Sequence, residues 1–113
     1  MDQQSNDDTV AHPVLSRLEP GENVQALARA ASASLVVTDR RLAVADEGRV
    51  ALDVPFNGLR RIQFDIERQR PATLVIVPEH PANEPQVLAV PPERFEEVTR
   101  ALALIGSRLY ELD

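Results

Sequence analysis

A short hairpin pattern at residues 35–45 constrains the fold of this chain most. Two apolar runs, Leu35–Val37 and Leu42–Ala45, flank the polar tetrad Thr38-Asp39-Arg40-Arg41. Apolar runs rich in β-branched residues around a short polar turn are typical of two antiparallel strands joined by a tight connection. The sequence therefore predicts strands over Ser34–Thr38 and Arg41–Ala45.

Four later segments also have the character of strands. In two of them every second residue is apolar, as in a half-buried strand. The first contains Val50, Leu52 and Val54, and the second contains Ile62, Phe64 and Ile66. The segment Ala72–Val77 is apolar at both parities, which is typical of a strand that is buried on both faces or central in a curled sheet. Gln86–Val90 forms the last predicted strand, after a proline-rich loop.

The end of the chain predicts an amphipathic helix. Pro91 and Pro92 suit a helix start, and the apolar stripe steps by three and four residues through Phe95, Val98, Leu102, Ile105 and Leu109. Leu104 lies off this stripe. We name it as a candidate contact with a partner subunit, the alternative being a single exposed Leu of the common kind.

The length of the chain, 113 residues, fits one domain. We place this domain at residues 13–110, after a disordered acidic tail over 1–12 and before a C-terminal tail over 111–113. The first ten residues have no basic segment and no apolar segment, so we do not expect a secretory signal and expect a cytoplasmic protein. The absence of Cys agrees with that compartment.

Several of these pieces resemble the bacterial pleckstrin-homology-like (PH-like) domains and their relatives of the GRAM type. The pieces are Pro20-Gly21-Glu22, Leu35–Leu42 with its Thr-Asp-Arg-Arg-Leu core, Val54-Pro55-Phe56 with Leu59 and Ile62, and the terminal helix. The resemblance covers residues 14–110.

The resemblance implies a mainly β fold of seven strands with one C-terminal α-helix, in which a curved sheet forms a barrel that the helix caps. It also implies a first strand over Val24–Ala30, although helix is the propensity expectation for this Ala-rich run. Members of the family are mainly binding and assembly modules, and some are similar to ring-forming homo-oligomers.

The charge pattern bears on possible ligands. The net charge is −6 and all twelve basic residues are Arg, so we expect no binding to nucleic acid and disfavour binding to an anionic membrane. Arg40 and Arg41 are nevertheless candidates for an anion site at the hairpin, and Arg60 and Arg61 for a basic patch. The alternative, which we favour for both pairs, is that these side chains form ion pairs with nearby acids or are simply solvated.

Residues for catalysis or metal binding are not apparent in the sequence. His12 and His80 each precede a proline in a predicted tail or loop, and no metal-ligand spacing, nucleophile motif or glycine-rich phosphate loop occurs. We therefore expect no cofactor, no metal and no enzymatic activity. The leading hypothesis is an interaction module acting through protein contact or self-assembly, and the alternative is recognition of an anionic lipid headgroup or a small anion by an Arg cluster.

Overall fold

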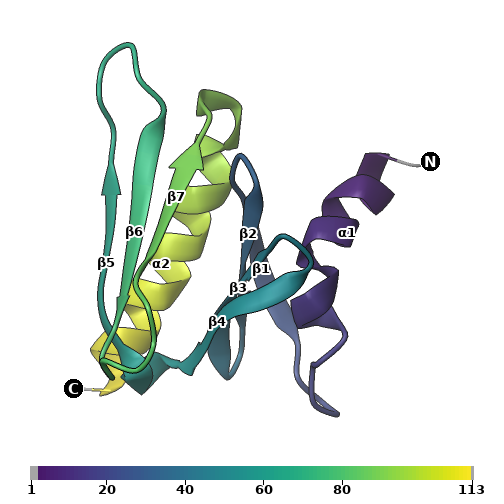
Figure 1. Ribbon diagram of the computed structural model, residues 1–113. Coiled ribbons are helices and arrows are strands. Elements are labelled where there is room, and N and C mark those ends of the chain that lie inside the picture. The colour runs from purple at the N-terminus through teal and green to yellow at the C-terminus, as the bar shows by residue number, and fades with distance from the viewer. Residues whose placement is uncertain (1–2, 113) are drawn as a thin grey trace.

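Seven strands form two antiparallel sheets in the computed structural model, which describes residues 3–112 (Figure 1). Sheet A has the order β1-β2-β3-β4, with bounds Val24–Arg29, Ala33–Thr38, Arg41–Asp46 and Arg49–Pro55. Sheet B has the order β5-β6-β7, with bounds Leu59–Asp65, Ala72–Pro78 and Gln86–Val90. Helices α1 (Gln3–Leu15) and α2 (Phe95–Leu112) and the 3-10 turns η1 (Phe56–Gly58) and η2 (Pro92–Arg94) complete the chain. The predicted mainly β fold with a C-terminal helix is confirmed.

The predicted closed barrel is wrong, because the two sheets remain separate. Strand β4 ends at Pro55, which has no backbone N–H to offer to a neighbouring strand, and η1 then carries the chain into sheet B. A backbone hydrogen bond from the N–H of Ala31 to the carbonyl of Ala89 (2.8 Å) joins the β1–β2 turn to β7. Helix α2 runs between the two sheets and packs most extensively on β1 of sheet A (Figure 1).

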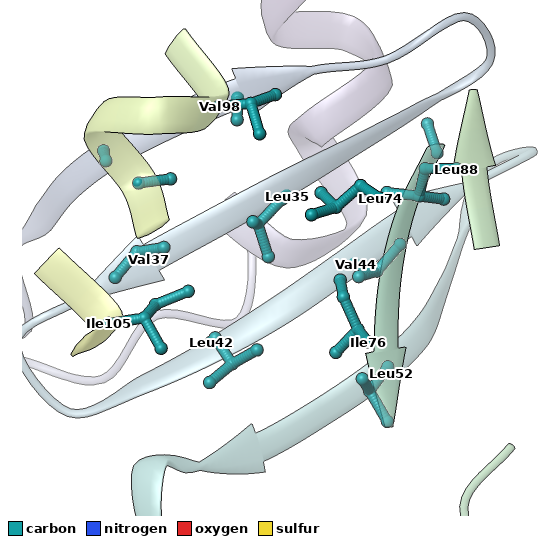
Figure 2. Packing of buried hydrophobic residues seen from close by; sticks show 14 of the residues in the cluster. Leu35, Val37, Leu42, Val44, Leu52, Leu74, Ile76, Leu88, Val98 and Ile105 are labelled. Carbon is teal, nitrogen blue, oxygen red and sulfur yellow. The ribbon is translucent and has the colours of Figure 1, made fainter. Parts of the chain in front are cut away.

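The main hydrophobic core lies between the sheets and α2. Figure 2 shows side chains of β2, β3 and β4 facing those of β6 and β7, with α2 closing one side. They are Leu35, Val37, Leu42, Val44 and Leu52 from sheet A, Leu74, Ile76 and Leu88 from sheet B, and Val98 and Ile105 from α2. The stripe predicted for α2 points inward at Val98 and Ile105. The alternation predicted for β4 points inward at Leu52 and Val54 but not at Val50, which packs on the outer face of sheet A, beyond the register shift in the β3–β4 pairing.

A charged contact also holds α2 on sheet A. The Arg29 guanidinium of β1 donates to Glu97 Oε2 at 2.6 Å, and the Arg29 backbone N–H donates to Oε1 at 3.0 Å. Arg94, one turn before Glu97, donates to the same Oε2 at 3.0 Å. The start of α2 is thereby fixed against the first strand.

Helix α1 replaces the disordered tail that the sequence predicted for residues 1–12. Ala11 and Val14 lie three residues apart, on one side of the helix, and are buried against Val36, Ala43 and Ala45 on the outer face of sheet A. Figure 1 shows α1 on the opposite side of sheet A from sheet B. The folded unit therefore begins within the predicted tail, and Met1 and Asp2 lie outside the described residues. At the other end α2 continues to Leu112, so the predicted C-terminal tail is helical up to that residue.

Two glycines differ in backbone conformation, and replacing each by Ala is expected to change the free energy of unfolding in opposite directions. Gly106 is exposed inside α2 with no atom within 4 Å of where a Cβ would lie, so Gly106→Ala is expected to raise the free energy of unfolding by about 0.5–1 kcal/mol. Gly48 also has open space but a φ of +79°, so Gly48→Ala is expected to lower it by about 1–2 kcal/mol. Urea unfolding of both variants measures this contrast, and effects of the same sign would contradict it.

Candidate functional site

Arg41, a predicted anion-binding residue, lies at the start of β3 and makes its polar contacts inside the molecule. Its Nε donates to Glu22 Oε2 at 2.8 Å and its Nη2 to Glu22 Oε1 at 2.9 Å, the two-pronged geometry that suits a guanidinium and a carboxylate. Nη1 donates to Asp53 Oδ2 on β4 at 2.9 Å, and Nη2 also donates to the carbonyl of Arg17 at 3.0 Å. The guanidinium thus joins the segment before β1 to β3 and β4.

Glu22 is the buried partner in this arrangement, with 7% of the residue exposed. Besides Arg41, its carboxylate accepts hydrogen bonds from Thr38 Oγ1 at 2.7 Å and from the backbone N–H of Glu19 at 2.9 Å. We call Glu22, Thr38, Arg41 and Asp53 the Arg41 cluster. The hydrogen bonds from Arg41, together with those from Glu19 and Thr38, outweigh burial and lower the pKa of Glu22 to about 2, while Glu22 in turn raises the pKa of Arg41.

Stability is therefore expected to depend on pH through Glu22. The pKa of Glu22 is lower in the folded chain than its ordinary value of 4.5, so its contribution is present above pH 4.5 and is lost as the pH falls toward about 2. Wild type should lose more stability over this interval than Glu22→Gln, which has no carboxyl to protonate. Urea unfolding of both proteins at several pH values between these limits measures the difference, and parallel curves would refute the assignment.

Arg40 is the more exposed residue of the pair, and it also makes an ion pair. Its Nη1 donates to Glu19 Oε1 at 2.8 Å, and 44% of its side chain is exposed. The preceding Asp39 accepts a hydrogen bond from the N–H of Asn23 at 2.9 Å and donates its own N–H to the Asn23 carbonyl at 3.1 Å. Oγ1 of Thr38 accepts the N–H groups of both arginines. The Thr-Asp-Arg-Arg signature therefore holds the β2–β3 turn against residues 19–23.

Arg60 and Arg61 lie apart from that signature, at the start of β5 in sheet B. Both residues are exposed, and with Val77 they border a surface hollow of about 410 Å³. Neither has an ion-pair partner among the described residues. Arg68 and Arg70 follow the other end of β5, and a strand of this length separates its ends by roughly 20 Å. These basic residues thus lie in three places, which are the β2–β3 turn, the start of β5 and the segment after β5.

Leu104 is half-buried and packs against the main core. The helix turns it far enough inward that it contributes to the contact between α2 and the sheets. Its role as a candidate partner contact therefore rests on a side chain that is only partly accessible.

The outer face of sheet B is a feature that the sequence did not single out. Inward residues of β6 belong to the core, while Val75 and Val77 point the other way and are half-buried. On β7 the outward residue opposite Val75 is Val87, which is 67% exposed. We define the sheet B face by its outward residues, which are Arg61, Gln63, Asp65, Thr73, Val75, Val77, Val87 and Ala89.

The two sheets differ in what covers their outer faces. The apolar outer face of sheet A lies under α1. Among the described residues, neither helix covers the sheet B face, because α1 packs on sheet A and α2 packs toward the core (Figure 1). The sequence predicted that Ala72–Val77 is buried on both faces or central in its sheet; the strand is central, but only its inner face is buried.

Comparisons with protein families, with curated proteins and with solved structures gave no significant match to this chain. Within the part of the chain that the structure describes, no three His, Asp or Glu side chains gather where they could hold a metal ion. No helix in that part combines the length and the apolar character needed to cross a bilayer. The Arg41 cluster, the Arg60–Arg61 pair and the sheet B face are candidate sites for a function in the described part of the chain.

Proposed function

We propose that this chain is a PH-like interaction module that acts without catalysis, by protein contact through the sheet B face. The observation that carries the proposal is the row of outward valines on β6 and β7, with Val87 67% exposed. Contiguous apolar surface of this kind favours association, since its burial removes it from water at roughly 25 cal/mol per Å².

The PH-like assignment is supported by the order of the elements. Seven strands precede a terminal amphipathic helix, which is the number and order of elements that the resemblance implies, although the strands form two sheets and not a barrel. The residues that carry the resemblance also have an architectural reason for being there: Glu22 and Thr38 to Arg41 bond with one another and tie the segment before β1 to the hairpin. A signature that serves the fold is compatible with a module whose binding surface lies elsewhere.

Protein contact is favoured over anion binding at the signature because Arg41 is already satisfied. Its guanidinium has two carboxylates and one carbonyl as partners, so an incoming anion would compete with Glu22 and Asp53. The sheet B face has no such competition. Among the described residues, no charged partner occupies the three valines and the alanine of this face, so a protein that binds there displaces only solvent from them.

Site-specific photo-crosslinking tests the proposal in the cells that make the protein. A photoreactive amino acid at position 87 should give covalent adducts with protein, whether with another chain or with a second copy. The same amino acid at position 110 is the matched control, because Tyr110 is 82% exposed and belongs to α2, not to the sheet B face. Adducts from neither position, or equal adducts from both, would contradict the proposal.

Recognition of an anionic headgroup or small anion is the second candidate, and one observation favours it. Arg60 and Arg61 are exposed beside the 410 Å³ hollow, where two guanidinium groups could receive one anion. Flotation with vesicles of anionic lipid, at low and at physiological salt, tests it. Binding that weakens with salt and is lost in the Arg60→Ala/Arg61→Ala double variant, but not in Arg49→Ala/Arg100→Ala, would support this function. No binding at low salt would exclude it for lipid.

A further inference from the structure

We infer that the partner of the sheet B face is a second copy of this chain, bound face to face about a two-fold axis. The inference rests on the proposed function and deepens it by naming the partner. It comes from the arrangement of charge on β5. The outward residues of this strand are Arg61, Gln63 and Asp65, so a positive and a negative side chain lie two positions on either side of a neutral one.

The side chains of β5 lie along the sheet B face in this order. Gln63 Nε2 donates to both Asp65 carboxylate oxygens at 3.0 Å, which places the acid beside the amide on the same face. Gln63 pairs in register with Val75, and Val75 pairs with Val87. The row Gln63, Val75, Val87 therefore runs straight across the sheet, midway between the two charges.

A two-fold axis along that row makes the face complementary to itself. The axis reverses the strand direction, so β5 of one copy lies over β5 of the other, and Arg61 of each copy faces Asp65 of the second copy. Two equivalent ion pairs form, and Val75 and Val87 meet their own counterparts on the axis. Isologous contacts of this kind are the commonest in homo-oligomers, and two sheets pack well face to face with their strands nearly aligned.

The composition of the face also points to a second copy. On sheet A, helix α1 of the same chain packs on the outward residues Val36, Ala43 and Ala45. On sheet B, no helix among the described residues packs on the outward residues Val75 and Val87. Three short strands offer an area at the low end for a specific interface, so the dimer is expected to dissociate in the micromolar range.

Charge reversal with mixing tests the geometry. Arg61→Glu leaves only acids at positions 61 and 65, and Asp65→Arg leaves only arginines, so each variant alone would bring two like-charged pairs together. Both residues are exposed, and the fold is therefore expected to survive either change. An equimolar mixture of the two variants restores both opposite-charge pairs in the heterodimer. Arg100→Glu makes the same charge change on the exposed side of α2 and serves as the control.

Sedimentation equilibrium over a range of concentrations is the measurement. Wild type and Arg100→Glu should show the same monomer–dimer equilibrium. Each sheet B variant alone should have a dissociation constant roughly tenfold higher or more, and the mixture should return to the wild-type value. Wild type that stays monomeric, single variants that dimerise as wild type does, or a mixture that gains nothing would each overturn the inference. A monomeric wild type that still gives adducts with another protein from position 87 would overturn it while leaving the proposed function standing.

Discussion

Replacing Arg41 by Met is expected to lower the free energy of unfolding by about 3–5 kcal/mol, the usual cost of removing one partner from a buried ion pair. The change leaves the Glu22 carboxylate buried with no cation, since Thr38 and the Glu19 N–H supply only neutral donors. It also removes the bonds to Asp53 and to the Arg17 carbonyl. Urea unfolding near neutral pH measures the loss.

Arg40→Met is the matched control for that measurement. Arg40 and its partner Glu19 have side chains that are 44% and 64% exposed, so the loss of this surface ion pair should cost less than about 1 kcal/mol. If the two variants were equally stable, the Arg41 cluster would not be holding the hairpin, and the signature arginines would again be open to a role in binding.

Ile105→Ala is expected to have the second large effect, a loss of about 2–5 kcal/mol. Ile105 is fully buried in the main core, where α2 meets both sheets (Figure 2), so the shorter side chain leaves a cavity that the rigid strands on either side cannot fill. Leu104→Ala on the same helix is the control, because this residue is only half-buried and should cost less. Urea unfolding of both variants measures the difference. A larger loss of stability for Leu104→Ala than for Ile105→Ala would contradict the observed orientation of α2 in the core.

The strands could be predicted because their pattern is local. In β4 and β5 inward residues alternate with outward ones at Leu52, Val54, Ile62 and Phe64, and in the 35–45 hairpin the polar tetrad separates the two strands. The alternation fails at its ends, because Val50 packs on the outer face of sheet A and Ile66 follows β5 and is 59% exposed. Strand β1 was less accessible to this reasoning, since Val24 to Arg29 contains small residues of high helix propensity and forms a strand through pairing with β2.

Helix α1 and the open arrangement of the sheets could not be predicted in the same way. Among residues 9–15 of α1, for which burial is described, only Ala11 and Val14 are buried core residues, and Pro13 stands between them. The segment therefore has neither a strong apolar stripe nor good helix propensity. What favours it is contact with β2 and β3, which are distant in sequence. Closure of the barrel is likewise decided by where β4 ends and where α2 packs.

The candidate site could also be predicted only in part. The sequence showed that Arg40 and Arg41 lie beside acids, and ion pairing was the favoured interpretation, but the partner Glu22 is nineteen residues away from Arg41 and only the fold brings it close. The sheet B face was missed for a different reason. A strand that is apolar at both parities predicts burial on both sides, and the sequence does not tell whether the second side is covered by the same chain or by another one.

An NMR dilution series tests the central claim, self-association through the sheet B face, most directly. Amide spectra recorded from micromolar to millimolar concentration should show shifts confined to residues such as Gln63, Val75 and Val87, and these shifts should disappear in Val87→Glu. The amide signals of the Arg41 cluster should not shift with concentration. Spectra that do not change with concentration, or changes centred on the Thr38–Arg41 turn, would contradict the account.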